Sequence, residues 1–172
     1  MSHIKYLAAK SDNEEREKWA NLFRWELARH SVAEEIIWYP ALQKALGENG
    51  AKAAERDRAE HQQAKEDLKT LENLKVTDAD FDRVFAKLFN ELKEHMEEEE
   101  KNHLPDFEAA ISEEESQRLA QQFENMKKWV PTRSHPSAPN KPPFETVAGF
   151  LATPIDKVMD MFTKFPTSTS NA

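Results

Sequence analysis

Five side chains of this sequence have the types and the spacing to bind a metal ion. His30 is followed four residues later by Glu34, His95 is followed in the same way by Glu99, and His61 lies between the two pairs. Residues four apart on an α-helix project from the same face, one turn or about 5.4 Å apart along the axis. Each pair could therefore direct an imidazole and a carboxylate at one ion, and each glutamate could bridge two ions.

The second pair lies at the end of an apolar stripe. Phe85, Leu88 and Leu92 follow the i, i+3, i+7 pattern of a buried helix face, and the next steps along that face are His95 and Glu99. A glutamate is almost never fully buried without a partner, because an unpaired carboxylate in an apolar interior is costly. A bound cation is the simplest compensation for this charge.

One His-x-x-x-Glu pair is expected by chance in a chain this rich in glutamate, where it would lie on a solvated face. Here three histidines occupy the inward faces of three consecutive helices, and two of them have a glutamate one turn on. Four-helix bundles build dinuclear metal sites from inward histidines and glutamates of facing helices. The combination therefore favours a metal site over a chance pattern.

The composition predicts an all-α protein and limits the metal. The 172 residues suffice for one domain with a sizeable core, glycine is scarce, and no segment alternates apolar and polar residues as a strand would. Cysteine is absent, which excludes disulfides, thiolate metal sites and cysteine nucleophiles. A site made of histidine, carboxylate and water suits iron, manganese or zinc better than copper(I).

Charge and hydropathy indicate the compartment and exclude some partners. The net charge of −8 leaves no basic face for a nucleic-acid backbone. No apolar run approaches the length of a membrane span, and the N-terminus has no signal-peptide pattern. We expect a cytoplasmic protein that binds neither nucleic acid nor membrane.

Turn and breaker residues divide the chain. Residues 1–128 are expected to form a helical bundle, with helices over 13–46, 50–74, 79–110 and 113–128. Pro40 and Pro105 should kink or restart two of these helices, Gly47 is placed as a C′ residue, and Ser112 as an N-cap.

The C-terminal part has a different composition. Residues 129–143 contain five prolines and are expected to form an extended linker. Residues 144–165 should form an amphipathic helical tail, broken into two short pieces at Thr153-Pro154, and residues 166–172 should be disordered. Its apolar stripe is expected to pack on the bundle; the stripe comprises Phe144, Val147, Leu151, Ile155, Val158 and Phe162.

Other acids and histidines are interpreted as solvated. A solvated acidic face is the simplest interpretation of Glu35, Glu97, Glu98 and Glu100. Glu100 has a second interpretation, because its spacing from His95 would let it replace Glu99. His103, just before the interruption at Leu104-Pro105, is expected to be a surface or cap residue, and His135 is expected to be solvated.

Several segments resemble one family, the hemerythrin-like (HHE cation-binding) domains. Their second-helix motif is similar to residues 25–35 (WELARHSVAEE), which are followed by Tyr39-Pro40-Ala41. Their third helix is similar to residues 57–65 (DRAEHQQAK), and their fourth to residues 95–100 (HMEEEE) with Leu104-Pro105. The segment 133–139 (RSHPSAP) is similar to fungal members, and the resemblance extends over residues 12–165.

The resemblance implies an up-down four-helix bundle that holds a non-haem di-iron centre. By position, the implied ligands are His30, Glu34, His61, His95 and Glu99, with manganese or zinc as alternatives to iron. Members bind or sense dioxygen or nitric oxide, or handle iron, so the implied partners are metal ions and small diatomic or peroxide ligands.

Two positions depart from the family pattern. Lys65 stands where true hemerythrins have a further histidine, which disfavours reversible oxygen transport. The family's first helix carries an Asp-His-Arg-Glu type motif, whereas this chain offers only His3 there, without the motif's neighbours. The first helix is therefore expected to be short. A shortened bundle would expose an apolar groove, which a homodimer could fill.

Three functions remain open from the sequence. The first is a metal-binding protein for O2, NO or redox sensing, or for iron handling. The second is an enzyme with di-iron oxidase or peroxidase-like activity at the same ligands. The third is a metal-free helical module that binds protein partners.

Overall fold

The computed structural model describes residues 2–9, 11–141 and 144–167, with side chains except for those of residues 144–150. Within the described residues there is no β-strand, which confirms the all-α prediction. The elements in chain order are α1 (Ser2–Ala8), α2 (Asn13–Ala33), the π-helical η1 (Glu34–Trp38), α3 (Tyr39–Leu46), α4 (Glu48–Glu72), α5 (Phe81–Glu98), the π-helical η2 (Glu99–His103), α6 (Leu104–Ala110), α7 (Glu113–Met126) and α8 (Phe144–Asp160).

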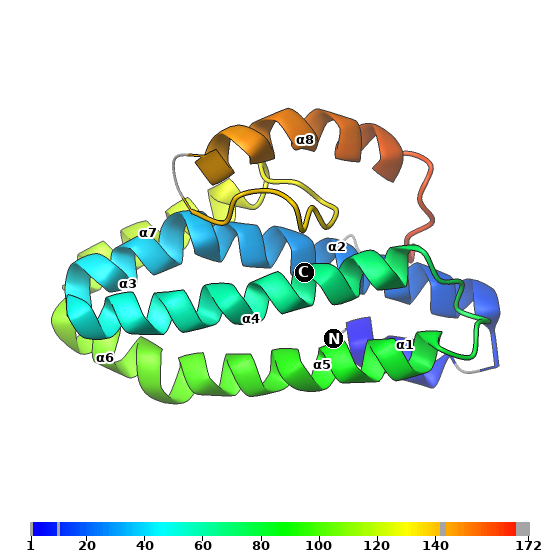
Figure 1. Cartoon of the computed structure of the whole chain (residues 1–172), viewed down its shortest axis with the longest axis horizontal. Helices are drawn as coiled ribbons and strands as arrows, with labels where there is room; N and C mark the ends of the chain where they lie inside the picture. Colours follow the sequence, from blue (N-terminus) through cyan, green and yellow to red (C-terminus); the bar gives the residue numbers. More distant parts are fainter. Residues whose placement is uncertain (1, 10, 142–143, 168–172) are drawn as a thin grey trace.

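The helices form the predicted bundle. In Figure 1, three long helical segments run along the long axis, and α8 lies across the top. The first segment is α2 continued through η1 into α3, the second is α4, and the third is α5 continued through η2 into α6. Short connections make α3 and α4, and then α4 and α5, antiparallel neighbours. The first helix is short, as expected, and packs against α2.

The bundle has an apolar half and a polar half. The apolar half joins Tyr6 of α1 to residues of the three long helices; its other buried members are Ala20, Phe23, Leu27, Leu68, Leu71, Phe81, Val84, Phe85 and Leu88. Beyond Leu88, the same interior contains ionisable side chains instead. The stripe predicted from Phe85, Leu88 and Leu92 therefore leads from the core into a polar site.

Local sequence signals set the helix ends. The Asp12 carboxylate accepts hydrogen bonds from the amides of Glu14 and Glu15 and so caps α2. The Ser112 hydroxyl caps α7 in the same way. Gly47 ends α3 with a φ of 60°, the left-handed conformation that favours glycine at this position.

The segment expected as a linker is held against the bundle. Residues 131–140 contain no helix, but Thr132 and Ser134 are buried. The Ser134 hydroxyl donates a hydrogen bond to the Lys65 carbonyl, 2.5 Å away. The amide of Thr132 donates to Asp156 of α8, 3.0 Å away. The segment therefore ties α8 to α4.

The C-terminal tail corrects two expectations. The structure has one helix, α8, with Pro154 inside it, where two pieces were expected. The described part of its apolar stripe faces away from the bundle, since Leu151, Ile155 and Phe162 are 73%, 67% and 84% exposed. The buried carboxylate of Asp156 accepts backbone hydrogen bonds from the preceding segment, and this polar anchor decides which face of α8 points inward.

The remaining tail lies partly outside the described residues. The structure does not describe the side chains of Phe144 and Val147. The prediction of disorder for residues 168–172 also lies outside the described residues. Pro166 is buried, contrary to the disorder expected there.

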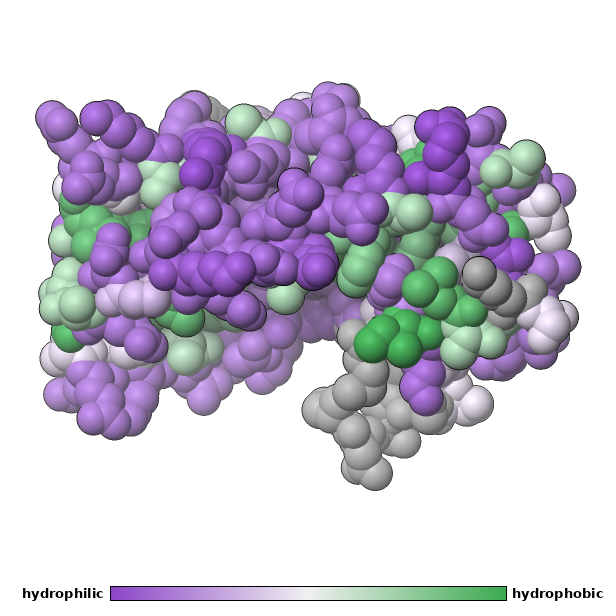
Figure 2. All heavy atoms as spheres, turned by 90° about the horizontal axis from the view of Figure 1, so that it is seen from below, coloured by the Kyte–Doolittle hydropathy of each residue, from purple (hydrophilic) through white to green (hydrophobic). Residues whose placement is uncertain are grey.

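The surface is mainly hydrophilic. Seen from below, it shows polar side chains over most of the face, with smaller groups of apolar atoms toward both ends of the bundle (Figure 2). Ile4 and Leu7 of α1 are exposed. Among the described residues, none of the helices combines the length and hydropathy needed to cross a bilayer.

A close helix contact at Gly50 gives a stability prediction. A Cβ at this position of α4 would lie 2.2 Å from the Leu42 carbonyl oxygen of α3. We expect Gly50→Ala to destabilise the protein by about 2 kcal/mol, because the two helices must separate. Thermal unfolding checks this, with the exposed Lys52→Ala in the same turn as control. An unchanged midpoint for Gly50→Ala would contradict the close contact.

Candidate metal centre

Two π-helical turns begin at two of the predicted ligands. In η1 the Tyr39 amide donates to the Glu34 carbonyl, and in η2 the Leu104 amide donates to the Glu99 carbonyl. Each donor directly precedes a proline, Pro40 or Pro105, whose missing amide removes one α-helical hydrogen bond. Such wide turns are frequent at functional sites, and here they alter which residues face inward.

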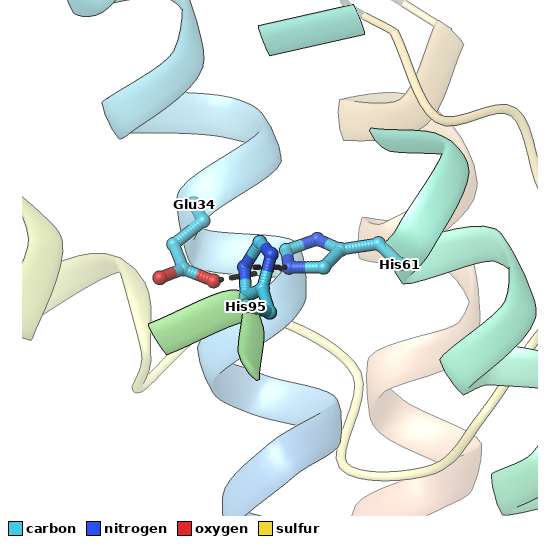
Figure 3. A group of neighbouring side chains, drawn as sticks. All are labelled: Glu34, His61 and His95. Carbon is cyan, nitrogen blue, oxygen red and sulfur yellow. Dashed lines mark hydrogen bonds and ion pairs between the residues drawn. The ribbon is translucent and has the colours of Figure 1, made fainter. Parts of the chain in front are cut away.

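Three predicted ligands meet inside the bundle. Glu34, His61 and His95 are all buried, and one ligand atom of each lies within 4.8 Å of the others. Figure 3 shows the carboxylate and the two imidazoles pointing toward one another from three different helices. The His61 Nε2 atom lies 3.4 Å from the Glu34 Oε2 atom and 3.2 Å from the His95 Nε2 atom.

An outer carboxylate orients each imidazole. The Nδ1 atom of His61 lies 3.3 Å from Glu35, and the Nδ1 atom of His95 lies 2.8 Å from Glu60. Histidines that bind metals usually donate their second ring N–H to a carboxylate or a carbonyl in this way. With Nδ1 protonated on both rings, the two Nε2 atoms have lone pairs that can bind an ion.

The donor atoms fit a cation. In the tautomer with Nδ1 protonated on both rings, the two Nε2 lone pairs face each other across 3.2 Å, and a metal ion would accept both. The Tyr39 hydroxyl, 3.1 Å from the His61 Nε2 atom, can satisfy only one of them. The Glu34 Oε2 atom is buried without a hydrogen bond, so the group also offers a free carboxylate oxygen.

The other two predicted ligands lie beside this group. His30 is half-exposed and contacts Glu34, with 2.8 Å between its Nε2 atom and the carboxylate. Burial works against ionisation, but the hydrogen bond and the charge of His30 lower the pKa of Glu34. Glu99 lies 3.6 Å from the His95 Nε2 atom. His30 therefore contacts the three-residue group at Glu34, and Glu99 approaches it at His95.

The surroundings of Glu99 favour its protonated form. Burial, together with the negative charges of Glu34 and Asp57, raises the pKa of Glu99 to about 9. Burial also raises the pKa of Asp57. The nearby positive charges therefore do not compensate all of the buried carboxyl groups in their ionised form. A bound cation would supply the missing positive charge.

Glu35 is buried, whereas the sequence suggested a solvated acid. Its side chain is 0% exposed and accepts a hydrogen bond of 2.6 Å from the Lys65 ammonium group. Glu35 follows Glu34 at the start of η1, where the wider turn brings consecutive side chains inward. Lys65 is thus bound to a carboxylate inside the bundle.

His103 is also placed differently from the expectation. Its side chain is 11% exposed, and its Nδ1 atom lies 3.2 Å from Asp57 of α4. His103 occurs four residues after Glu99, and Asp57 four residues before His61. The one-turn spacing that identified the first ligands could therefore have found these two residues.

His3 does not reach the polar site. Its ring stacks on Phe89, with 3.3 Å between the ring centroids, and lies near Phe85 in the apolar half of the bundle. It is therefore not brought to the other histidines. Of the remaining acids singled out, Glu100 is exposed, and Glu98 contacts Arg56 at the surface.

A cavity leads from the surface to both imidazoles. It has a volume of about 360 Å³ and is lined by His61 and His95 together with Leu27, Ala64 and Leu92. Charged residues line its outer part, namely Arg56, Glu60, Glu91, Glu94 and Glu98. The cavity is large enough to admit small molecules to the candidate centre.

Comparison with known proteins identifies related sequences. Residues 2–107 match the family model of the hemerythrin HHE cation-binding domain. An uncharacterised hemerythrin-like protein of Schizosaccharomyces pombe is 49% identical over 166 residues, which cover 96% of this chain and 82% of the relative. No solved structure gives a significant match to the chain.

The raised pKa of Glu99 predicts a pH-dependent stability. Between the ordinary pKa of 4.5 and about 9, the unfolded chain loses a proton that the folded protein keeps. The contribution of Glu99 is therefore complete below pH 4.5 and is lost as the pH rises through this window. In metal-free protein, Glu99→Gln should raise the free energy of unfolding at pH 8 by about 1–3 kcal/mol, and by much less near pH 4. Urea unfolding measures this.

The control for this prediction is Glu100→Gln, because Glu100 is exposed. This variant should leave the stability unchanged at both pH values. An equal effect of the two substitutions, or an effect of Glu99→Gln that does not depend on pH, would contradict the assignment.

The buried pair of Glu35 and Lys65 gives a second stability prediction. Lys65→Met removes the ammonium group and leaves a buried carboxylate, so we expect a loss of about 3 kcal/mol. Adding Glu35→Gln should restore part of this loss. Chemical unfolding checks both, with Lys69→Met as control, since the Lys69–Glu72 pair is exposed at its lysine and should contribute little. Equal losses for the two lysines would argue against the pair.

Proposed function

This chain belongs to the hemerythrin HHE cation-binding family, and on that premise we propose that its bundle holds a non-haem di-iron centre. We further propose that the centre senses O2, NO or redox state, or handles iron. The single observation that carries the proposal is the buried group of Glu34, His61 and His95, with two imidazole Nε2 atoms 3.2 Å apart.

The donor set supports iron as the metal. Two histidines and one carboxylate, with other positions open, form the ligand set typical of non-haem Fe(II) sites. Glu34, His61 and His95 supply this set, and Glu99 and His30 lie next to it. Manganese and zinc accept the same atoms, so the metal must be identified by analysis.

The protein's own residues position the donors and limit access. Glu35 and Glu60 hold the His61 and His95 rings with Nε2 facing the site. A bound iron would supply redox chemistry and an open position for a small ligand. The cavity beside the two histidines, with apolar walls at Leu27 and Leu92, supports the entry of diatomic molecules or peroxide.

Lys65 favours sensing or iron handling over oxygen transport. Its ammonium group is bound to Glu35 inside the bundle and is not available as a ligand. The oxygen-carrier ligand set would therefore remain incomplete at this position.

Elemental analysis tests the proposal. We expect about two irons per chain in protein purified under anaerobic, iron-replete conditions, as in other dinuclear bundles. The double variant His61→Ala, His95→Ala should lose the iron held by these histidines. His135→Ala, at a histidine that pairs with Asp156 of α8 and is not part of the Glu34, His61 and His95 group, should retain all of it. Circular dichroism establishes that each variant is folded.

The outcomes separate the three functions. Iron in the unaltered protein that depends on His61 and His95 supports the proposed centre. Absence of metal from the unaltered protein would overturn it and favour an interaction module. Turnover of peroxide by the iron-loaded protein would add an enzymatic role at the same ligands.

A further inference from the structure

A second group of potential ligands lies one helical turn beyond the first. It consists of Asp57, Glu99 and His103, and one ligand atom of each lies within 4.8 Å of the others. Asp57 precedes His61 by one turn of α4, and Glu99 follows His95 by one turn. The second group therefore lies beside the first along the bundle axis, toward α3 and α6.

Every member of this group has a buried atom without a hydrogen bond. These atoms are both carboxylate oxygens of Asp57, the Oε1 atom of Glu99 and the Nδ1 atom of His103. Asp57 is 0% exposed, so water cannot solvate its charge. Buried polar atoms are nearly always satisfied, and three adjacent residues with unsatisfied atoms indicate a missing partner.

The neighbouring cations do not fill this role. The Arg56 Nε atom is 3.5 Å from Asp57, but Arg56 is half-exposed and also pairs with Glu98 at 3.1 Å. The His103 Nδ1 atom lies 3.2 Å from Asp57 without hydrogen-bond geometry. The outer Nε2 atom of His103 lies 3.4 Å from Arg56.

We propose that Asp57, Glu99 and His103 bind a second divalent cation, with Glu99 placed between the two ions. This inference rests on the proposed function, because it assigns the position of the second ion in that centre. Two carboxylates and one imidazole favour iron or manganese, and the carboxylates offset the charge of the ion. Bonds of about 2.1 Å need ligand atoms within about 4.2 Å of each other, so small side-chain shifts suffice.

Two rival positions are less suitable. Asp57, Glu60 and His95 also lie close together, but Glu60 is 45% exposed and is engaged by the Nδ1 atom of His95. Glu60 therefore orients the His95 ring and is less suitable as a ligand. The other rival is His30, which is 42% exposed and is paired with Glu34.

The test is the stoichiometry of Fe(II) in metal-free protein reloaded under anaerobic conditions. We expect two ions per chain in the unaltered protein and one in Asp57→Asn and in His103→Gln. His135→Gln makes the same change at a half-buried histidine outside the bundle core and should retain two ions. Circular dichroism and the unfolding midpoint without metal show whether each variant is folded. Fe(II) should raise that midpoint more in the unaltered protein than in either variant.

The remaining outcomes overturn the inference in distinguishable ways. Two ions in folded Asp57→Asn and His103→Gln, with one lost in His30→Gln, would place the second ion at His30. One ion in the unaltered protein, unaffected by either variant, would remove the second site and reduce the proposed di-iron centre to a single ion at Glu34, His61 and His95. No ion in the unaltered protein would overturn the proposed function itself, and this inference with it.

Discussion

Carboxylates buried among apolar helices must be neutralised, and most of the polar half of this bundle is arranged around that requirement. Glu34, Glu35 and Asp57 are almost completely enclosed, and Glu99 is mostly buried. An ionised carboxylate in such surroundings is unstable unless a proton, a cationic side chain or a metal ion accompanies it. The electrostatics favour a proton on one of these acids, and cationic side chains accompany others. Carboxylate oxygens of Glu34, Asp57 and Glu99 still have no hydrogen-bond partner.

The acids divide according to their partners. Glu35 accepts a hydrogen bond from the ammonium group of Lys65, and the imidazole of His30 lowers the pKa of Glu34 against the effect of burial. For Glu99, burial and the nearby charges of Glu34 and Asp57 raise the pKa and so favour the form that holds a proton. A divalent cation would replace that proton and also pair with the unsatisfied oxygens. The buried oxygen atoms without hydrogen-bond partners are therefore consistent with the cation binding that characterises the family.

Outer carboxylates give the site its direction. Glu35 and Glu60 contact the Nδ1 atoms of His61 and His95, so the opposite nitrogens face each other across the interior. The same pattern of an acid behind an imidazole is found in metal sites, where it fixes the tautomer and the ring orientation. The cavity beside these rings then gives small molecules a route to the donors, and charged residues surround its outer part.

The sequence by itself determined the helices, the apolar stripe and the inward direction of His61 and His95, because α-helical periodicity fixes which residues share a face. It did not determine the surroundings of Glu35 and His103, which were expected at the surface and lie inside. Glu35 directly follows the ligand Glu34 in a π-helical turn, where 3.6 residues per turn no longer assigns the faces. His103 lies four residues after Glu99, a one-turn spacing that could have indicated its position, but its partner Asp57 belongs to another helix.

The orientation of the C-terminal helix likewise depended on tertiary structure. An apolar stripe predicts the buried face of a helix, yet the described stripe residues of α8, Leu151, Ile155 and Val158, are exposed. Asp156, on the opposite face, accepts amide hydrogen bonds from Thr132 and Arg133, two residues more than twenty positions earlier. Periodicity along one helix contains no information about such a distant donor, so only the folded chain could decide which face turned inward.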